Sequence, residues 1–235
     1  MKFLTLWIPL ACLAGAIVNS FVPVPYFYEE LGFVENFTVI FLLGTVVCLL
    51  RHAKGNFKSM PPLDKALLVV MVLGAIYFAG EELSWGQHMF GFETAESYKE
   101  INYQGETNIH NLEGIYGKLF DKIPRTILTI GIFFGGILFP FIKRKLPDLI
   151  STYVPRVREV LLVSVLAVFI SVPEKIYQLV TDEKFRQKPA IGGSKAFQAR
   201  FDSGELKEFY IALFILLFAL FFIRRSRALK VGVTQ

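Results

Sequence analysis

Residues 63–80 read LDKALLVVMVLGAIYFAG, and residues 81–111 continue without a proline as EELSWGQHMFGFETAESYKEINYQGETNIHN. The first part is an apolar run close to the roughly 17 to 25 residues that a helix needs to cross a hydrocarbon core about 30 Å thick. The second part is polar and holds most of the side chains that could take part in chemistry. The two parts together predict a transmembrane helix followed by a functional stretch at the membrane surface.

The rest of the chain repeats the apolar pattern. Hydrophobic residues make up 54% of the 235 positions, and 24 of them are Phe. The apolar runs are continuous rather than alternating, which favours helices whose backbone groups are satisfied within the segment. We therefore predict an all-α integral membrane protein with about six transmembrane helices in a single domain, residues 1–235. The other five runs cover residues 3–23, 34–50, 126–142, 157–176 and 208–223.

The positions of the Lys and Arg residues along the chain indicate the membrane topology. The short turns at 51–65 and 143–158, together with the two ends of the chain, hold 14 of the 25 Lys and Arg residues. By the positive-inside rule these turns and both termini are cytoplasmic, so the polar stretch lies outside. The net charge of +5 therefore reflects membrane orientation and does not indicate a nucleic-acid partner. The opposite side carries 17 of the 20 acidic residues, and such a face would favour a cation, a metal or a basic partner.

Within the outer loop, residues 81–125, we expect one short or amphipathic helix. No proline or turn dipeptide interrupts the third apolar helix before Gly91, so we expect that helix to continue to about Phe90. Continuous helix would place Glu81, Ser84, Trp85 and His88 on one face. After a turn around Gly105, we expect a new helix capped by Thr107 or Asn108.

Several side chains of the outer stretch could bind a metal or move a proton. Imidazoles and carboxylates suit zinc, or iron and manganese where oxygen ligands dominate, so a divalent metal such as zinc is a possible cofactor. The metal ligands we predict are His88, Glu106 and His110, and the catalytic set is Glu81, Glu82, His88, Glu106 and His110.

Two alternatives to a metal site stay open. The same groups could form a metal-free pocket in which Glu82 or Glu106 acts as a general acid or base with a raised pKa. They could also be ordinary solvated residues at a wet interface.

Amide side chains are unusually dense in the same stretch. A plain connector between two membrane helices has no need for them, whereas a buried hydrogen-bond network or a polar headgroup site does. Trp85 could stack on a sugar or sit in the interfacial aromatic belt. The predicted substrate-binding residues are Trp85, Gln87, Asn102, Gln104, Asn108 and Asn111.

The motifs GEExSWGQ at 80–87 and NxQxExNxHN at 102–111 resemble a motif pair of uncharacterised bacterial multi-pass inner-membrane proteins. The resemblance implies a bacterial inner-membrane location and a shared site, and it indicates no substrate. One hypothesis is a hydrolase or transferase acting on a lipid-linked or envelope substrate. The other is a non-enzymatic subunit or assembly factor, in which residues 80–111 form a structural latch or a docking surface for other membrane subunits.

Two smaller expectations concern the helices themselves. Gly131, Gly135 and Gly136 in the fourth apolar run are small residues of the kind that let membrane helices approach closely. His52 follows the second apolar run in a short basic turn, where we expect a solvated side chain.

Overall fold

The structure is a computed structural model that describes residues 2–22, 24–28, 32–102, 105–109, 112, 114–174, 176 and 201–233. The side chains of His88 and of residues 230–233 lie outside this description. The described residues are predominantly helical and contain no β-strand; residues Asn102 and Leu112 form an isolated bridge. The protein is thus an all-α multi-pass membrane protein, as the continuous apolar runs predict.

Five helical segments of the described chain are long and apolar enough to cross a bilayer. In two of them a shorter helix precedes or follows the main one: η1 (Phe3–Trp7) runs into α1 (Ile8–Phe21), and η2 (Phe57–Ser59) extends α2 (Phe33–Asn56). Helix α3 (Pro62–Glu82) begins with proline. An N–H in the first turn of a helix has no intrahelical acceptor, so the lack of an N–H in proline costs nothing at this position. The other two segments are Gly114–Lys145 and Ser203–Leu229.

The Gly114–Lys145 segment is a chain of short helical pieces, and the Ser203–Leu229 segment is part of one long helix. Helix α14 extends over Ser203–Val233. The pieces of the former are α6 (Gly114–Gly117), η4 (Lys118–Lys122), α7 (Ile123–Ile132), η5 (Phe133–Leu138), α8 (Phe139–Ile142) and η6 (Lys143–Lys145). After them come α9 (Asp148–Ser151) and α10 (Val157–Phe169).

The predicted helix at 157–176 is present as α10, which has 13 residues. That length is below the roughly 17 residues that a helix needs to span the hydrocarbon core. Five of the six predicted spans therefore appear at full length in the described part of the chain.

The chain forms two compact units, so the prediction of a single domain stays a prediction. The first unit is Met1–Phe37 with Ile132–Phe214, and the second is Thr38–Gly131 with Ile215–Gln235. In the first unit α10 packs against η5, and a Cβ placed on Gly136 would lie 2.1 Å from Ser164 Oγ. Gly136 is therefore required for close helix packing, as predicted, whereas no described atom lies within 4 Å of a Cβ at Gly131 or Gly135.

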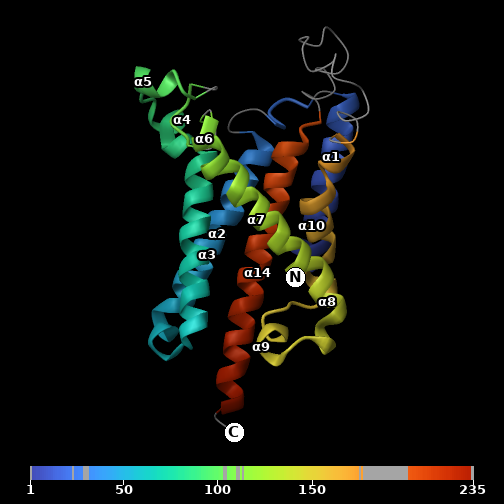
Figure 1. Cartoon of the computed structure of the whole chain (residues 1–235). Helices are drawn as coiled ribbons and strands as arrows, with labels where there is room; N and C mark the ends of the chain where they lie inside the picture. The colour runs from blue at the N-terminus through green and yellow to red at the C-terminus, as the bar shows by residue number, and fades with distance from the viewer. Residues whose placement is uncertain are drawn as a thin grey trace. The chain divides into compact units, whose positions relative to one another are not determined.

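The second unit holds the outer stretch at one end and a buried polar cluster at the other. In Figure 1, α2 and α3 run side by side, and α4, α5 and α6 lie at the end of α3 away from the α2–α3 turn. At the turn end, Arg225 Nη1 of α14 donates to both carboxylate oxygens of Asp64 at 3.0 Å. His52 hydrogen-bonds Ser226 at 3.2 Å. His52 is 4% exposed, so the expectation of a solvated histidine is wrong.

Candidate functional site

Helix α3 does not continue to Phe90 as expected; it ends at Glu82. Ser84, Trp85 and Gly86 follow with φ values of 44°, 52° and 89°, all in the left-handed region. Three successive residues of this kind cannot continue a right-handed helix. Each non-glycine residue held there costs on the order of 1 to 3 kcal/mol, so surrounding contacts must maintain the break.

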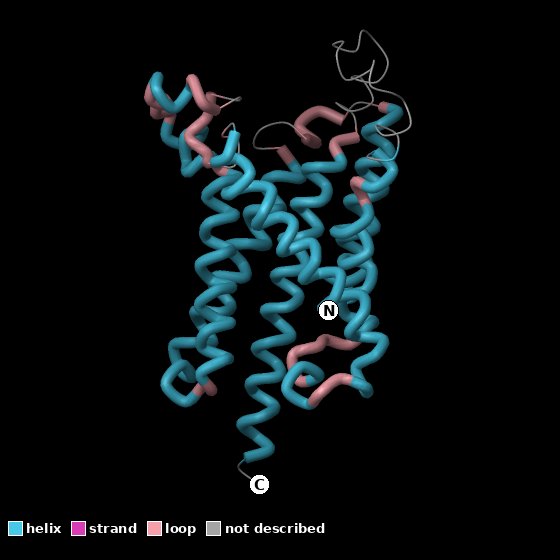
Figure 2. The backbone as a smooth tube through the Cα atoms, viewed as in Figure 1, coloured by secondary structure: helices cyan, strands magenta, loops and turns pink. Residues whose placement is uncertain are grey.

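Short helices and loops replace the expected continuous helix. After the break come α4 (Gln87–Phe90) and α5 (Glu96–Lys99), joined by loops in Figure 2. We call the described residues between α3 and α6, namely 83–102, 105–109 and 112, the head. The head corresponds to the short helical element expected in the outer loop.

The break turns Trp85 back onto α3. Its Nε1 donates a hydrogen bond to Glu81 Oε1 at 2.6 Å, and its ring lies 6.3 Å from that of Tyr77. Gly80 makes room for the indole, because a Cβ at Gly80 would lie 2.8 Å from Trp85 Cζ3. Trp85 therefore packs against α3 and does not lie on the continuous helical face with Ser84 and His88 that the sequence predicts.

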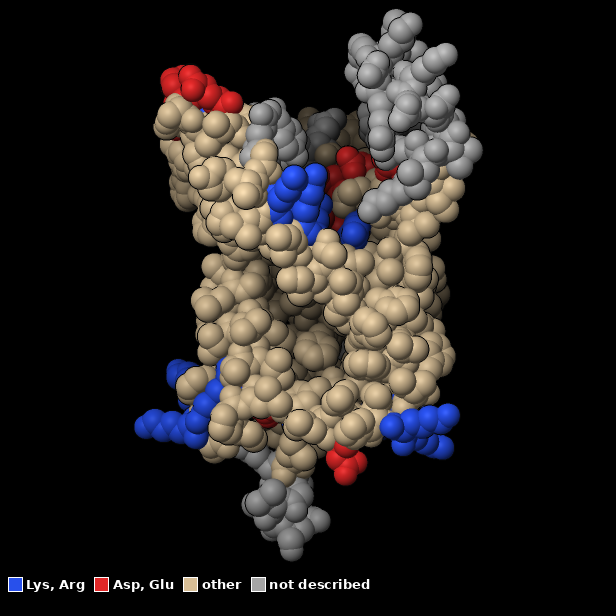
Figure 3. All heavy atoms as spheres, in the orientation of Figure 1, with Lys and Arg blue, Asp and Glu red and all other residues tan. Residues whose placement is uncertain are grey.

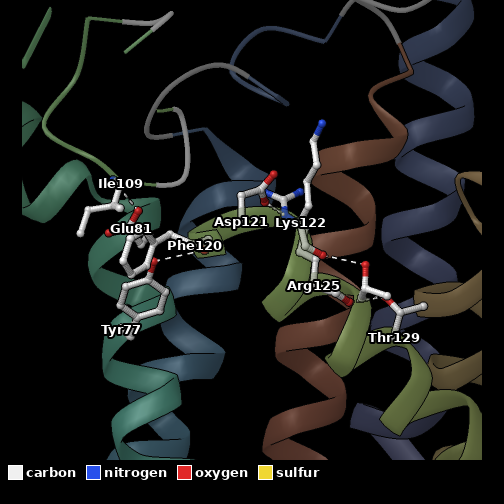
Figure 4. Close-up of polar contacts among 9 residues, drawn as sticks. Tyr77, Glu81, Ile109, Phe120, Asp121, Lys122, Arg125 and Thr129 are labelled. Carbon is white, nitrogen blue, oxygen red and sulfur yellow. Dashed lines mark hydrogen bonds and ion pairs between the residues drawn. The ribbon is translucent and has the colours of Figure 1, made fainter. Parts of the chain in front are cut away.

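Glu81 joins α3 to the second half of the head. Its side chain is buried, with 3% exposure, and its Oε2 accepts a hydrogen bond from the main-chain N–H of Ile109 at 2.7 Å. Figure 4 shows this bond beside the one that Tyr77 OH donates to the carbonyl of Phe120 at 3.3 Å. Both carboxylate oxygens of Glu81 thus accept a hydrogen bond from within the protein.

The carboxylate of Glu106 is also hydrogen-bonded within the head. Ser84 Oγ donates to Glu106 Oε2 at 2.7 Å, and Asn108 Nδ2 donates to the same oxygen at 2.6 Å. Asn108 Nδ2 also lies 3.1 Å from Ser84 Oγ, which can accept from it. The three side chains form a closed triangle in which Ser84 and Asn108 are buried.

Amides extend the network to the main chain. Asn102 Nδ2 donates to the carbonyl and the side-chain oxygen of Asn108, at 2.8 and 3.0 Å. Gln87 Oε1 accepts from the N–H of Thr107 at 2.6 Å, and Tyr98 OH donates to the carbonyl of Asn108 at 3.0 Å. Of the two alternatives for the dense amides, the hydrogen-bond network is present among the described residues, and the headgroup site stays a prediction.

We call the hydrogen bonds between residues 81–87 and residues 102–109 the latch, and these two segments its arms. Four bonds cross between the arms: Glu81 with Ile109, Ser84 with Glu106, Ser84 with Asn108, and Gln87 with Thr107. Each buried polar group that is satisfied in this way avoids a desolvation penalty of about 1 to 3 kcal/mol. The latch therefore holds the head in one conformation.

The predicted helix capped at Thr107 or Asn108 is absent. A turn does occur at Gly105, whose N–H donates to the carbonyl of Asn102 at 3.0 Å, but the next helix starts at Gly114. The two side-chain oxygens that would cap the predicted helix have other partners: Thr107 Oγ1 is hydrogen-bonded to Thr94 Oγ1, and Asn108 Oδ1 accepts from Asn102 Nδ2. Neither group is available to start a helix at that point.

The predicted site residues fall into three groups. The structure brings together Glu81, Trp85, Gln87, Asn102, Glu106 and Asn108. Glu82 is half-buried on the last turn of α3 and takes no part in the latch bonds described above. The side chain of His88 and the residues Gln104, His110 and Asn111 lie outside the described residues.

The zinc site stays a prediction. Of its three proposed ligands, Glu106 is described, and its Oε2 accepts bonds from Ser84 and Asn108. A metal there would have to use the other oxygen or displace these donors.

Sequence reasoning missed the main-chain donors of Thr107 and Ile109, and also Tyr98 and Thr94. Thr94 Oγ1 lies 2.8 Å from Thr107 Oγ1, so the first half of the head is tied to the second. Burial raises the pKa of the Tyr98 hydroxyl, and the charge of Glu81 raises it further. Tyr98 therefore remains a neutral donor in the network.

Charge separates the two ends of the second unit. In Figure 3, acidic side chains gather at the tip of the head, and Lys and Arg side chains gather where α2 meets α3. Glu93, Glu96 and Glu100 are exposed in the head, and Lys54 and Lys58 are exposed at the other end. The orientation expected from the positive-inside rule stays a prediction.

Comparison of the chain with known protein families, with curated proteins and with solved structures finds no match. What the site can do must therefore be argued from its own geometry.

Proposed function

We propose that this multi-pass membrane protein is a non-enzymatic component of a bacterial inner-membrane assembly, a subunit or an assembly factor, and that the head is its docking element. One observation carries the proposal. The buried carboxylate of Glu81 is bonded on one side to Trp85 and on the other to the main chain at Ile109. These contacts serve a structural latch, the role expected of a stretch that must present a fixed surface.

The other carboxylate supports the same conclusion. A catalytic carboxylate has to exchange its hydrogen-bond partner with a substrate or a water molecule during turnover. Glu106 Oε2 instead accepts two bonds, from the buried side chains of Ser84 and Asn108. A rigid head also loses less conformational freedom when a partner binds, which favours affinity.

Site-directed photocrosslinking tests the docking role. The photoreactive residue p-benzoylphenylalanine is placed at the exposed positions Glu93 and Glu100 of the head, and at Lys58 as a matched exposed control at the other end of the second unit. We expect one adduct of constant mass from both head positions and none from position 58.

The latch supplies the second half of this test. Glu81→Gln should reduce the adduct by loosening the head, and the exposed substitution Glu96→Gln should leave it unchanged. A head that gives no adduct in cells, with the protein isolated as a monomer, would contradict the docking role.

A second candidate function is supported by the backbone at Ser84. Sparsely populated backbone conformations cluster at functional sites, and Ser84 has a φ of 44° with its hydroxyl 2.7 Å from a carboxylate. A hydroxyl that donates to a carboxylate can act as a nucleophile after proton transfer. The candidate is therefore a hydrolase or transferase for a lipid-linked or envelope substrate, with zinc as the possible metal.

Two measurements address the enzymatic candidate. A fluorophosphonate probe should label the purified protein and fail to label Ser84→Ala. Elemental analysis should find zinc that is lost in His88→Ala and His110→Ala. Absence of both labelling and metal from folded protein would remove this candidate and leave the docking role.

A further inference from the structure

The head carries an apolar edge that the latch does not use. Met89 and Phe90 of α4 are 63% and 79% exposed, and Phe92, two residues later, is also exposed. We call these three residues the apolar edge. Large apolar side chains that are exposed together and bordered by polar residues indicate an interaction surface.

The apolar edge is held in place by the head. Gln87, at the start of α4, is bonded to the N–H of Thr107 at 2.6 Å. Met89 is two residues further along, so it lies on the opposite face of this helical turn. The ring of Phe90 lies against Gly86, where a Cβ would be 2.9 Å from Cδ2. Met89 and Phe90 are therefore part of a short helix that is held to the rest of the head.

A helix long and apolar enough to span a membrane adjoins each end of the head along the chain. Helix α3 ends at Glu82, seven residues before Met89, and it is a membrane span. The next span begins at Gly114, and its first turns expose Ile115 and Leu119. The apolar edge thus begins seven residues along the chain from the end of a helix that can span the membrane.

Charge gives the head a direction. Glu93, Glu96 and Glu100 are exposed, and Figure 3 shows acidic side chains at the tip of the head with uncharged atoms between that tip and the spanning helices. Aromatic and long apolar side chains favour the level of the lipid headgroups, whereas carboxylates favour water.

From this arrangement we infer that the apolar edge inserts into the interfacial layer of the membrane that α3 crosses, so that the head lies against the phospholipid surface with its acidic tip in water. The partner of this surface is the bilayer itself. A second copy of the chain or another protein would instead shield the edge from lipid.

Spin-label accessibility tests the inference. In a background with Cys12→Ala and Cys48→Ala, a nitroxide is attached at Phe90→Cys and, as the control, at Glu96→Cys in the acidic tip. The protein is placed in vesicles of phosphatidylethanolamine and phosphatidylglycerol. Collision rates are then measured with molecular oxygen, which concentrates in lipid, and with a nickel chelate, which stays in water.

We expect the ratio of oxygen to nickel collisions at position 90 to exceed that at position 96 severalfold. Met89→Cys provides a second label if Phe90→Cys does not elute as a single species. Equal, water-like ratios at 90 and 96 would overturn the inference. Shielding of position 90 from both reagents would also overturn it, because a protein would then cover the edge.

Discussion

Replacing Glu81 with glutamine changes one buried atom and very little shape. The carboxylate accepts from Trp85 Nε1 at 2.6 Å and from the N–H of Ile109 at 2.7 Å, with 3% of the residue exposed. A carboxamide keeps one acceptor oxygen and presents an NH₂ group to the second donor. One hydrogen bond to a charged group, worth about 1.5 to 3 kcal/mol, is therefore lost, and the other becomes a weaker neutral bond.

Together these changes should lower the free energy of opening the head by about 2 to 4 kcal/mol. Since each 1.4 kcal/mol corresponds to a factor of ten, the amide hydrogens of residues 105–109 should exchange about 30 to 700 times faster in Glu81→Gln than in the wild type. Hydrogen–deuterium exchange measured by mass spectrometry on a peptide that covers these residues gives the rate directly. Exchange in the half of α3 near Pro62 should not change.

The matched control is Glu96→Gln, the same chemical change in the same head. Glu96 is exposed and paired with Lys99 at 2.8 Å on the surface, where ion pairs contribute little. We expect no resolvable change in exchange. Wild-type exchange rates in Glu81→Gln, or equal acceleration in both variants, would refute the reasoning that Glu81 holds the latch.

Three further predictions concern the rest of the protein. Gly136→Ala should destabilise the first unit by about 1 to 3 kcal/mol in thermal unfolding, because the new Cβ clashes with the neighbouring helix, whereas Gly135→Ala should have little effect. Asp64→Asn should cost about 3 to 5 kcal/mol in the same assay, since it leaves the buried charge of Arg225 uncompensated; unchanged unfolding would contradict this. Burial raises the pKa of Asp202 above its usual 3.8, so the folded state binds the proton more tightly than the unfolded state does. The free energy of unfolding therefore falls as the pH rises from the usual pKa to the raised pKa. Asp202→Asn, whose side-chain oxygen can still accept from the first turn of α14, should remove that part of the pH dependence.

The membrane helices are predictable because lipid imposes a simple rule on them. An apolar run of sufficient length must be helical to satisfy its backbone, and the runs around Leu68 and Leu217 need no further information. The limits of helices are less predictable. Helix α10 ends at Phe169, which leaves it shorter than its apolar run suggested.

The end of α3 shows why the head was only partly predictable. Nothing within the local sequence before Gly86 forbids helix at Ser84, and helix propensity alone would continue it. The break is stabilised by Glu106 and Asn108, which lie 22 and 24 residues from Ser84. Contacts at this separation override local preference and cannot be read from spacing.

For the head, the residue composition was a better guide than the spacing of residues along the chain. The unusual density of amides between Asn102 and Asn108 indicated either a hydrogen-bond network or a headgroup site, and a network is present, although its acceptors and its main-chain donors were not identified. His52 is the opposite case. Its basic turn suggested a solvated residue, but Ser226, 174 residues away, covers it.

The latch has a consequence for the order in which the chain acquires its structure during synthesis. The bonds between its arms join residues 20 to 28 positions apart, so the loops that must close are short, and short loops close early. The bonds from α14 to Asp64 and His52 span 161 and 174 positions and must wait for the last helix to be made. A ribosome-bound chain that stops before Arg225 should therefore already contain a closed head. The contacts of the C-terminal helix, α14, should be the last to form in the second unit.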